Sequence, residues 1–321
     1  MSSPKKTAKG IKGGLAGMLG SVLSESRVEK LRLAGKSVIR TWNQYRTSLS
    51  GMIGLTILVI FVLVALFGPA LLSSFPDPNS QSWAKVNPAY APPSTKYWFG
   101  TDYIGRDVFS LTVLGTRASL IVGILASLIS IVLGTVVGVT SGYLGKFSDE
   151  MLMRFTDFFL VIPWFPFMIV VSFLLGPSFT NVIIVIGITS WPSTARIVRS
   201  QVLSVKEKGF VERARCIGAG GGRIVTRHIL PNVFPLIFAN TILLVANSIF
   251  SESFLDFFGL GDPRVVSWGI MLEEAYEWGA FSSFAWWYIL APGACIVILI
   301  MSFYLVGDAL DEVLNPRLRR R

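Results

Sequence analysis

Six long apolar stretches constrain the fold of this chain more than any other feature of its sequence. The hydrocarbon core of a bilayer is about 30 Å thick, so a helix that rises about 1.5 Å per residue needs roughly 20 apolar residues to cross it. The fourth stretch is marginal because Trp191-Pro192 interrupts it and Arg196 and Arg199 lie near its end. The sequence therefore predicts an all-α integral membrane protein with six transmembrane helices, at about residues 51–73, 113–142, 152–175, 180–203, 232–254 and 284–307.

The composition agrees with a chain that has lipid as its main solvent. It is 52% hydrophobic and 15% charged, whereas soluble domains carry roughly a quarter charged residues. A net charge of +10 would point to nucleic acid in a soluble protein, but here cationic loops beside an anionic leaflet explain it and no nucleic-acid partner is expected. Cys216 and Cys295 form no disulfide framework, and the single histidine, His228, excludes a histidine-rich metal site.

The basic residues predict how the chain is oriented. Of 29 Lys and Arg residues, ten precede residue 50, eight lie from Arg196 to Arg227 and four close the chain, whereas the 255–283 connection has only Arg264. The positive-inside rule then places both termini and the 143–151 and 204–231 loops in the cytoplasm. The outward connections are 74–112, 176–180 and 255–283, so we expect a multi-pass protein of the cell membrane.

These assignments divide the chain into four parts. Residues 1–48 form a basic cytoplasmic tail, in which 27–46 can form a surface helix, although a merely solvated tail fits equally well. Residues 49–112 hold the first transmembrane helix and an extracytoplasmic loop. Residues 113–310 form a core of five transmembrane helices with the 204–231 loop, and 311–321 form a basic cytoplasmic tail.

The stretch GFVERARCIGAGGGRIVTRHILPN, residues 209–232, interrupts two apolar segments with basic residues and glycines. It is consistent with a solvated connection, a phosphate-binding loop or a docking element. Residues 204–217 can form a short helix in which Glu212 pairs with Arg215 or Lys208. Gly218 is suited to end that helix, because glycine accepts positive φ, and Pro231 suits the first turn of the next span.

The sequence contains no complete catalytic or nucleotide-binding motif. Gly35-Lys36-Ser37 lacks the upstream glycine of a P-loop, because Lys30 occupies that position. The glycine run from Gly218 to Gly222 is followed by Arg223 where a dinucleotide fingerprint needs glycine, and no strand precedes it. We therefore expect a non-enzymatic chain with no cofactor of its own.

Small residues recur every fourth position in the second apolar stretch. Gly134, Gly138 and Gly142 lie on one face of the predicted helix. Small residues let a second helix approach closely, which matters in lipid because apolar side chains gain little by leaving it. This face therefore predicts a site of helix packing.

The 204–231 loop resembles the EAA motif of the permeases of ATP-binding-cassette (ABC) importers. That motif reads Glu-Ala-Ala, three residues, Gly, nine residues, then Ile-x-Leu-Pro. Two positions depart from it, since Arg213 replaces the first Ala and His228 replaces the Ile. The residues that match in register are Glu212, Ala214, Gly218, Leu230 and Pro231.

Four further blocks resemble one branch of these permeases, the dipeptide/oligopeptide/nickel family, and in particular its C-type subunit. Phe99–Ser110 is similar to the family's FGTD-x-x-GRDV-x-S block. Phe257–Gly261 is similar to FLGLG, with Phe258 in place of Leu, and Ser267–Leu272 to SWG-x-ML. The spacing of Arg154, Asp157 and Pro163 also matches, and the resemblance covers roughly residues 50–318.

The resemblance implies a type I ABC importer permease, a non-catalytic half of a translocation pathway. Its partners would be a second homologous permease, two ATPase subunits that carry ATP and Mg²⁺, and an extracytoplasmic solute-binding protein. Peptides are the first expected substrate, with nickel or oligosaccharides as alternatives. The residues implied to couple to the ATPase are Glu212, Arg213, Ala214, Arg215 and Gly218.

Other interpretations of the sequence stay open beside this one. The outward 255–283 loop contains Trp268 and Trp278, which either anchor at the membrane interface or contact the binding protein. A self-sufficient secondary transporter or channel would need inverted repeats or charged midplane residues, and neither is found. Asp157 and Glu252 lie near predicted span ends, where structural pairing is favoured over a proton path.

Overall fold

The computed structural model describes residues 39, 41–72 and 87–314, and this part is helical apart from turns and one isolated antiparallel bridge between Thr101 and Asp107. Residues up to Leu49 form a unit of their own. Within it, the ring of Trp42 stacks on Tyr45 with centroids 6.0 Å apart. Residues 1–38 and 40 of the expected tail at 1–48, residues 315–321 of the C-terminal tail and residues 74–86 of the outward connection lie outside the described residues.

Among the described residues, five helices are long and apolar enough to cross a membrane, and the bent pair α5–α6 makes a sixth if it is counted as one span. The prediction of an all-helical membrane protein is therefore confirmed. From Leu49 onward the helices are α3 (Leu49–Leu71), α4 (Val108–Leu144), α5 (Lys146–Val161), α6 (Trp164–Leu175), α7 (Phe179–Lys206), α8 (Gly209–Cys216), α9 (Gly221–Ile224), the π-helix η3 (Val225–Ile229), α10 (Leu230–Phe257), α11 (Trp268–Glu277) and α12 (Trp286–Leu314).

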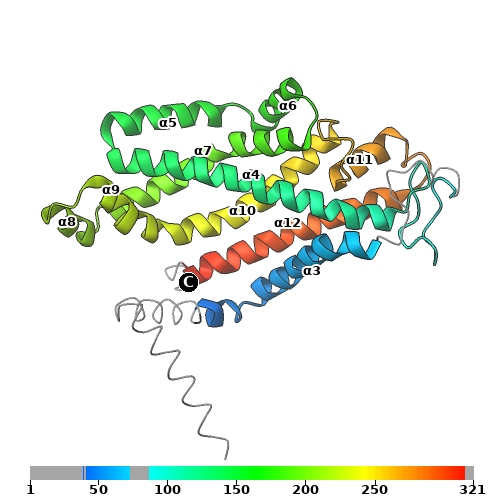
Figure 1. Ribbon diagram of the computed structural model, residues 1–321, viewed down its shortest axis with the longest axis horizontal. Coiled ribbons are helices and arrows are strands. Elements are labelled where there is room, and N and C mark those ends of the chain that lie inside the picture. The colour runs from blue at the N-terminus through cyan, green and yellow to red at the C-terminus, as the bar shows by residue number, and fades with distance from the viewer. Residues whose placement is uncertain (1–38, 40, 73–86, 315–321) are drawn as a thin grey trace, which may run out of the picture. The chain divides into compact units, whose positions relative to one another are not determined.

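Helices α4, α7, α10 and α12 run side by side, with α8 and α9 at one end and α11 at the other (Figure 1). We call these the α8 end and the α11 end. Helix α4 begins where the Asp107 carboxylate accepts the N–H of Ser110 at 3.0 Å, and it ends at Gly145, whose N–H bonds Ser141 at 3.0 Å. Such end contacts satisfy backbone groups that the helix itself leaves unpaired.

The small-residue face of α4 lies against α7. A Cβ built on Gly134 would come within 2.6 Å of Thr194, and one on Gly138 within 2.6 Å of the Ala195 carbonyl. A Cβ on Gly142 would come within 2.9 Å of Val202. The two backbones therefore approach so closely that no side chain fits between them, and dispersion contacts replace a hydrophobic driving force.

Replacing Gly138 with alanine is expected to weaken this contact. The added methyl overlaps backbone of α7, which cannot rotate away, so we expect a loss of about 1–3 kcal/mol of stability. The measurement is the midpoint of thermal unfolding in detergent. Gly293→Ala in α12 is the matched control, because a Cβ there has no neighbour within 4 Å. A Gly138→Ala midpoint equal to that of Gly293→Ala would contradict the assigned contact.

The third span is not the continuous helix expected at 152–175. It is broken between Val161 and Trp164, and α5 and α6 meet at an angle of 89°. Pro163 lies at the break, where its missing N–H and its ring disfavour the continuation of a regular helix. The backbone therefore changes direction within the apolar region instead of crossing it straight.

The other spans differ from their expected bounds mainly by being longer. The second begins at Val108 rather than 113, and the last continues to Leu314 rather than 307. Helix α7 runs unbroken through Pro192. The 204–231 loop is helical again from Gly221, after the turn at 217–220, and α9, η3 and α10 form one continuous span over Gly221–Phe257.

Candidate functional site: the α8 loop and the two ends of the bundle

Helix α8 is joined to α7 by only two residues, Glu207 and Lys208, and it packs one face onto the bundle. Val211 is fully buried and Ala214 is 5% exposed. They belong to a core cluster with residues of α7 and α10 and of the segment between them, namely Val198, Val202, Val205, Ile224, Ile229 and Val233. Ala214 of the EAA-like motif therefore serves to seat α8 on the spans.

The opposite face of α8 carries the charged residues. Glu212, Arg213 and Arg215 are all exposed. Among the described residues Glu212 forms no ion pair, so the expected pairing with Arg215 or Lys208 is wrong. The helix thus holds three charged side chains outward without neutralising them locally, which leaves them available to another surface.

Gly218 closes α8 with a Schellman turn. The N–H of Ala219 bonds the Ala214 carbonyl at 3.0 Å, and the N–H of Gly218 bonds Arg215 at 2.9 Å. Gly218 has φ +81°, a left-handed conformation that glycine adopts without steric cost. The direction in which the chain leaves α8 is therefore fixed by one residue.

The loop is also tied to α4. The ammonium of Lys206 donates to the carbonyls of Tyr143 at 2.7 Å and Gly142 at 3.3 Å, which are left unpaired at the end of that helix. The ring of His228, one of the two departures from the motif, lies beside Phe210 with centroids 6.3 Å apart. Arg213, the other departure, is exposed.

The α11 end is held by a buried ion-pair network, and its acidic and basic members come from segments far apart in the sequence. Arg106 bonds the Asp102 carboxylate through Nε and Glu274 through Nη2 at 2.5 Å. Tyr288 donates to the same Glu274 oxygen at 2.8 Å. Burial acts to lower the pKa of Arg106, but the charges of Asp102 and Glu274 outweigh it and raise that pKa. The network fastens the segment before α4 to α11 and α12.

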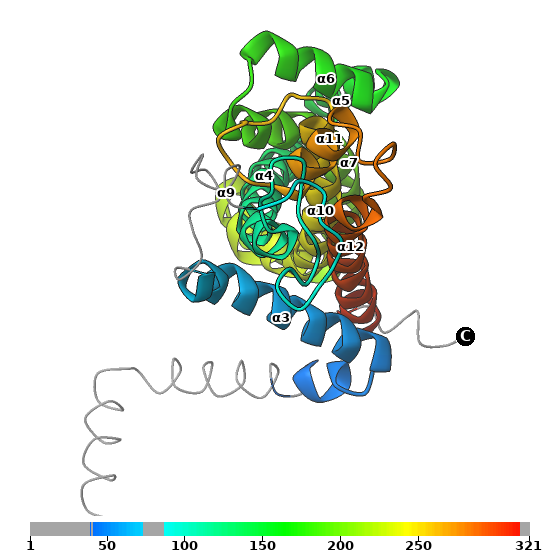
Figure 2. The ribbon, with the colours of Figure 1, turned by 90° about the vertical axis from the view of Figure 1, so that its right-hand side faces the viewer.

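Trp268 does not line an outer surface, so its side chain is not available for either of the two roles that the sequence left open, membrane anchoring or contact with a binding protein. It is fully buried, and its indole N–H bonds the Thr112 carbonyl at 2.9 Å. Trp278 is 55% exposed and stacks on Tyr103 with centroids 4.8 Å apart. Figure 2 looks onto this end and shows α11 with the segment before α4. Of the two tryptophans, only Trp278 remains a candidate contact.

Two carboxylates of α10 are buried near the α11 end. Both oxygens of Glu252 accept from Ser119 at 3.1 Å, and one also accepts from Ser253 at 3.1 Å. Asp256, expected in the outer loop, lies inside α10 and accepts from Ser267 at 2.5 Å. Structural hydrogen bonding to serine, rather than pairing with a basic residue, therefore accounts for Glu252.

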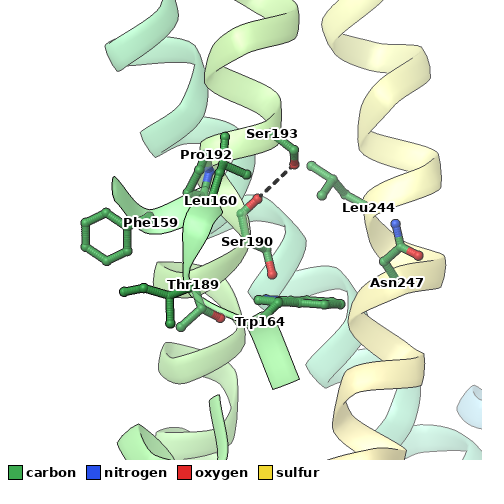
Figure 3. A pocket seen from close by; sticks show the side chains of 10 residues that line it. Phe159, Leu160, Trp164, Thr189, Ser190, Pro192, Ser193, Leu244 and Asn247 are labelled. Carbon is green, nitrogen blue, oxygen red and sulfur yellow. Dashed lines mark hydrogen bonds between the residues drawn. The ribbon is translucent and has the colours of Figure 1, made fainter. Parts of the chain in front are cut away.

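A pocket of about 270 Å³ lies where the third span breaks, and sequence reasoning missed it. Its walls come from the end of α5, the start of α6, the middle of α7 and α10 (Figure 3). They include Phe159, Trp164, Ser190, Leu244 and Asn247. The only local signals were Pro163 and Pro192, which do not show that these helices meet.

A family model described as binding-protein-dependent transport system inner membrane component matches residues 130–320. The chain belongs to this family. A second model, the N-terminal transmembrane domain of oligopeptide transport permease C, matches residues 39–93 of this permease. With five apolar helices and one bent pair in the part of the chain that the structure describes, it is a multi-pass inner membrane protein. The resemblance drawn from the sequence blocks is thus confirmed.

Curated relatives of this permease cover most of its length. The dipeptide transport system permease protein DppC of Bacillus subtilis strain 168 is 35% identical over 280 residues, 87% of this chain and 85% of that protein. The oligopeptide transport system permease protein OppC of the same strain is 34% identical over 278 residues, 86% of this chain and 88% of that protein.

The fold is shared with a solved transporter. A chain of the MetNI methionine ABC transporter, in an inward-facing conformation, superposes with a TM-score of 0.51 at 18% identity. The match covers 66% of this chain and 97% of that one. The expected ABC importer permease fold is therefore confirmed, while a likeness at this identity says nothing of substrate.

Proposed function

We propose that this permease forms half of the membrane pathway of an ATP-driven peptide importer and receives the force of ATP hydrolysis through α8. The observation that carries the proposal is the two-sided construction of this helix. Val211 and Ala214 fix it to the spans, whereas Glu212, Arg213 and Arg215 stay exposed and unpaired among the described residues. A short rigid helix with a charged outer face can transmit displacement from a partner to the spans behind it.

The partners follow from the same assignment. A second permease would complete the pathway, two ATPase subunits would dock at the α8 end, and a solute-binding protein would deliver substrate at the α11 end. ATP and Mg²⁺ would bind the ATPases, so this chain would itself be non-catalytic. Peptide substrates are supported by the names of the dipeptide and oligopeptide relatives.

Reconstitution in proteoliposomes tests the proposal. We expect uptake of alanine peptides only when this permease is present with its co-expressed permease, ATPase and binding-protein partners and with ATP. A chain that acts alone as a secondary transporter would instead take up solute without them. Uptake by this permease alone, independent of ATP, would overturn the proposed function.

Reversing the charge of Glu212 tests the role of the α8 surface. Glu212→Lys is expected to lower ATP-dependent uptake by about tenfold or more, because loss of one partner of a charge pair that is buried and hydrogen-bonded at an interface costs about 2–5 kcal/mol. Glu207→Lys is the matched control, since Glu207 is also exposed but lies outside α8. Equal uptake by both variants would remove Glu212 from the coupling surface.

A further inference from the structure

Two basic residues on one face of α7 bond the turn between α4 and α5, which lies at the α8 end of the bundle (Figure 1). Lys206, the last residue of α7, donates to the carbonyls of Tyr143 and Gly142. Arg199 lies about two helical turns earlier, on the same face. It bonds both oxygens of Asp149 in the first turn of α5, through Nε at 2.5 Å and Nη2 at 2.6 Å. One helix therefore holds both the end of α4 and the start of α5.

The Arg199–Asp149 pair fixes the position of α5 more firmly than the other ion pair between α5 and α7. It is bidentate, and its two side chains are 32% and 18% exposed. Arg196 and Asp157 share a single hydrogen bond, and both side chains are about half exposed. Bidentate arginine–carboxylate pairs add geometric specificity as well as energy, whereas exposed pairs contribute little. The start of α5 is therefore fastened to α7 by Arg199.

Helix α5 has few other contacts that fix its angle. Among its residues, all of which the structure describes, only Thr156 is buried, and Phe155 and Phe159 pack on α7. Two residues with positive φ, Gly145 at +66° and Lys146 at +49°, precede most of the helix, and the 89° break follows it. Hinges are commonly a few residues at element ends that absorb changes of φ and ψ. Helix α5 therefore lies between two turns that can serve as hinges.

The end of α7 that carries these basic residues continues directly into α8. Only two residues separate the helices. Val205, next to Lys206, and Val211 of α8 are both fully buried in one core cluster. Packed side chains and rigid helices are the physical carriers of coupling between distant sites. A displacement of α8 can therefore reach Lys206 and Arg199 through continuous packing.

We infer that Lys206 and Arg199 are positioning residues that carry the displacement of α8 into the turn between α4 and α5, so that α5 changes its angle with each cycle of ATP hydrolysis. The inference rests on the proposed function, since it needs an ATPase that moves α8. Neither residue belongs to the EAA-like motif. A lysine that merely capped α4 would stabilise that helix, but it would not set how much uptake accompanies each ATP hydrolysed.

Removing either basic group should uncouple uptake from ATP hydrolysis. In the complete reconstituted importer, Lys206→Met and Arg199→Met are each expected to lower uptake of tri-alanine per ATP hydrolysed by about 2- to 30-fold, the effect expected of residues that modulate coupling. Lys206→Arg should keep most of the wild-type ratio, because a guanidinium has enough donors for both carbonyls. Asp149→Arg combined with Arg199→Asp should recover much of the ratio that Arg199→Met loses, since it forms the pair with its ends exchanged.

Two matched controls remove a positive charge nearby without breaking these contacts. Lys146 is exposed in the same turn and forms no ion pair among the described residues. Arg154 pairs with Glu150 of its own helix, so its loss leaves α5 joined to α7. Lys146→Met and Arg154→Met should both keep the wild-type ratio of uptake to hydrolysis. An equal loss in these controls would assign the effect to net charge and overturn the inference.

Hydrogen exchange detects the transmitted movement without measuring uptake. In the wild-type complex, trapping with ATP and vanadate should change the exchange of α8 and of residues 143–149. In Lys206→Met and Arg199→Met, only α8 should respond. An unchanged response of 143–149 in these variants, or uptake and ATPase activity that fall in parallel, would overturn the inference. A wild-type complex without ATP-dependent uptake would instead refute the proposed function itself.

Discussion

Replacing Gly218 with valine is expected to abolish ATP-dependent uptake while leaving the permease inserted in the membrane. Gly218 has φ +81°, and both hydrogen bonds that end α8 depend on this conformation. Residues with a Cβ in left-handed backbone cost about 1–3 kcal/mol, and β-branched residues are the least tolerant. A helix of two turns cannot absorb that strain, so its end unwinds or turns its charged face away from the ATPase.

The expected loss of uptake in Gly218→Val has a conformational rather than a steric cause, because a Cβ at Gly218 meets nothing within 4 Å. Gly220→Val is therefore a matched control: it makes the same change two residues later, where φ is −65° and a Cβ is also free of contacts. Gly218→Asn should keep much of the activity, since Asn tolerates this conformation. Normal uptake by Gly218→Val would remove the turn from the coupling mechanism.

Replacing Arg106 with alanine is expected to destabilise the α11 end by about 3–5 kcal/mol, the usual cost of leaving a buried charge without its partner. The Asp102 side chain is fully buried, and that of Glu274 is 21% exposed. Loss of the guanidinium leaves Asp102 buried and uncompensated, so the segment before α4 detaches from α11. The measurement is thermal unfolding in detergent, where we expect a fall of roughly 6–20 °C in the midpoint.

Two further variants show how much of the expected destabilisation depends on the planar guanidinium and on the burial of the ion pair. Arg106→Lys keeps the charge but loses the planar fork that bonds two carboxylates, and its midpoint should lie between those of wild type and alanine. Arg154→Ala breaks an ion pair with Glu150 whose two side chains are 76% and 62% exposed, and it should change the midpoint little. If Arg106→Ala behaved like Arg154→Ala, the network would not hold this end together.

Apolar length predicted the spans well, because every backbone group in lipid must be satisfied by a helix. The length of an apolar stretch could not predict which proline would interrupt a transmembrane helix. Pro163 ends α5, whereas Pro192 lies inside a continuous α7. The difference lies in packing: α7 is pressed along the glycine face of α4, with Thr194 directly against Gly134. Such a contact joins residues far apart in the sequence.

The candidate site was predictable where it depends on local backbone chemistry. A glycine after a short helix predicted the turn at Gly218. The sequence could not show which tryptophan of the outer loop, Trp268 or Trp278, is buried, because the rotation of α11 about its own axis decides this. Trp268 fits inside only because Gly115 of α4 has no side chain, since a Cβ there would lie 2.9 Å from the indole. Nothing near Trp268 in the sequence carries that information.

The break in the third span has a consequence for biogenesis. Helix α5, with 16 residues, is about 24 Å long, and α6, with 12, is about 18 Å, so neither half reaches across a core of about 30 Å by itself. Helix α5 also carries Asp149 and Asp157, whose partners Arg199 and Arg196 both belong to α7. We therefore expect the third span to insert poorly into the bilayer by itself. It should become stable there only once the fourth span has been synthesised beside it.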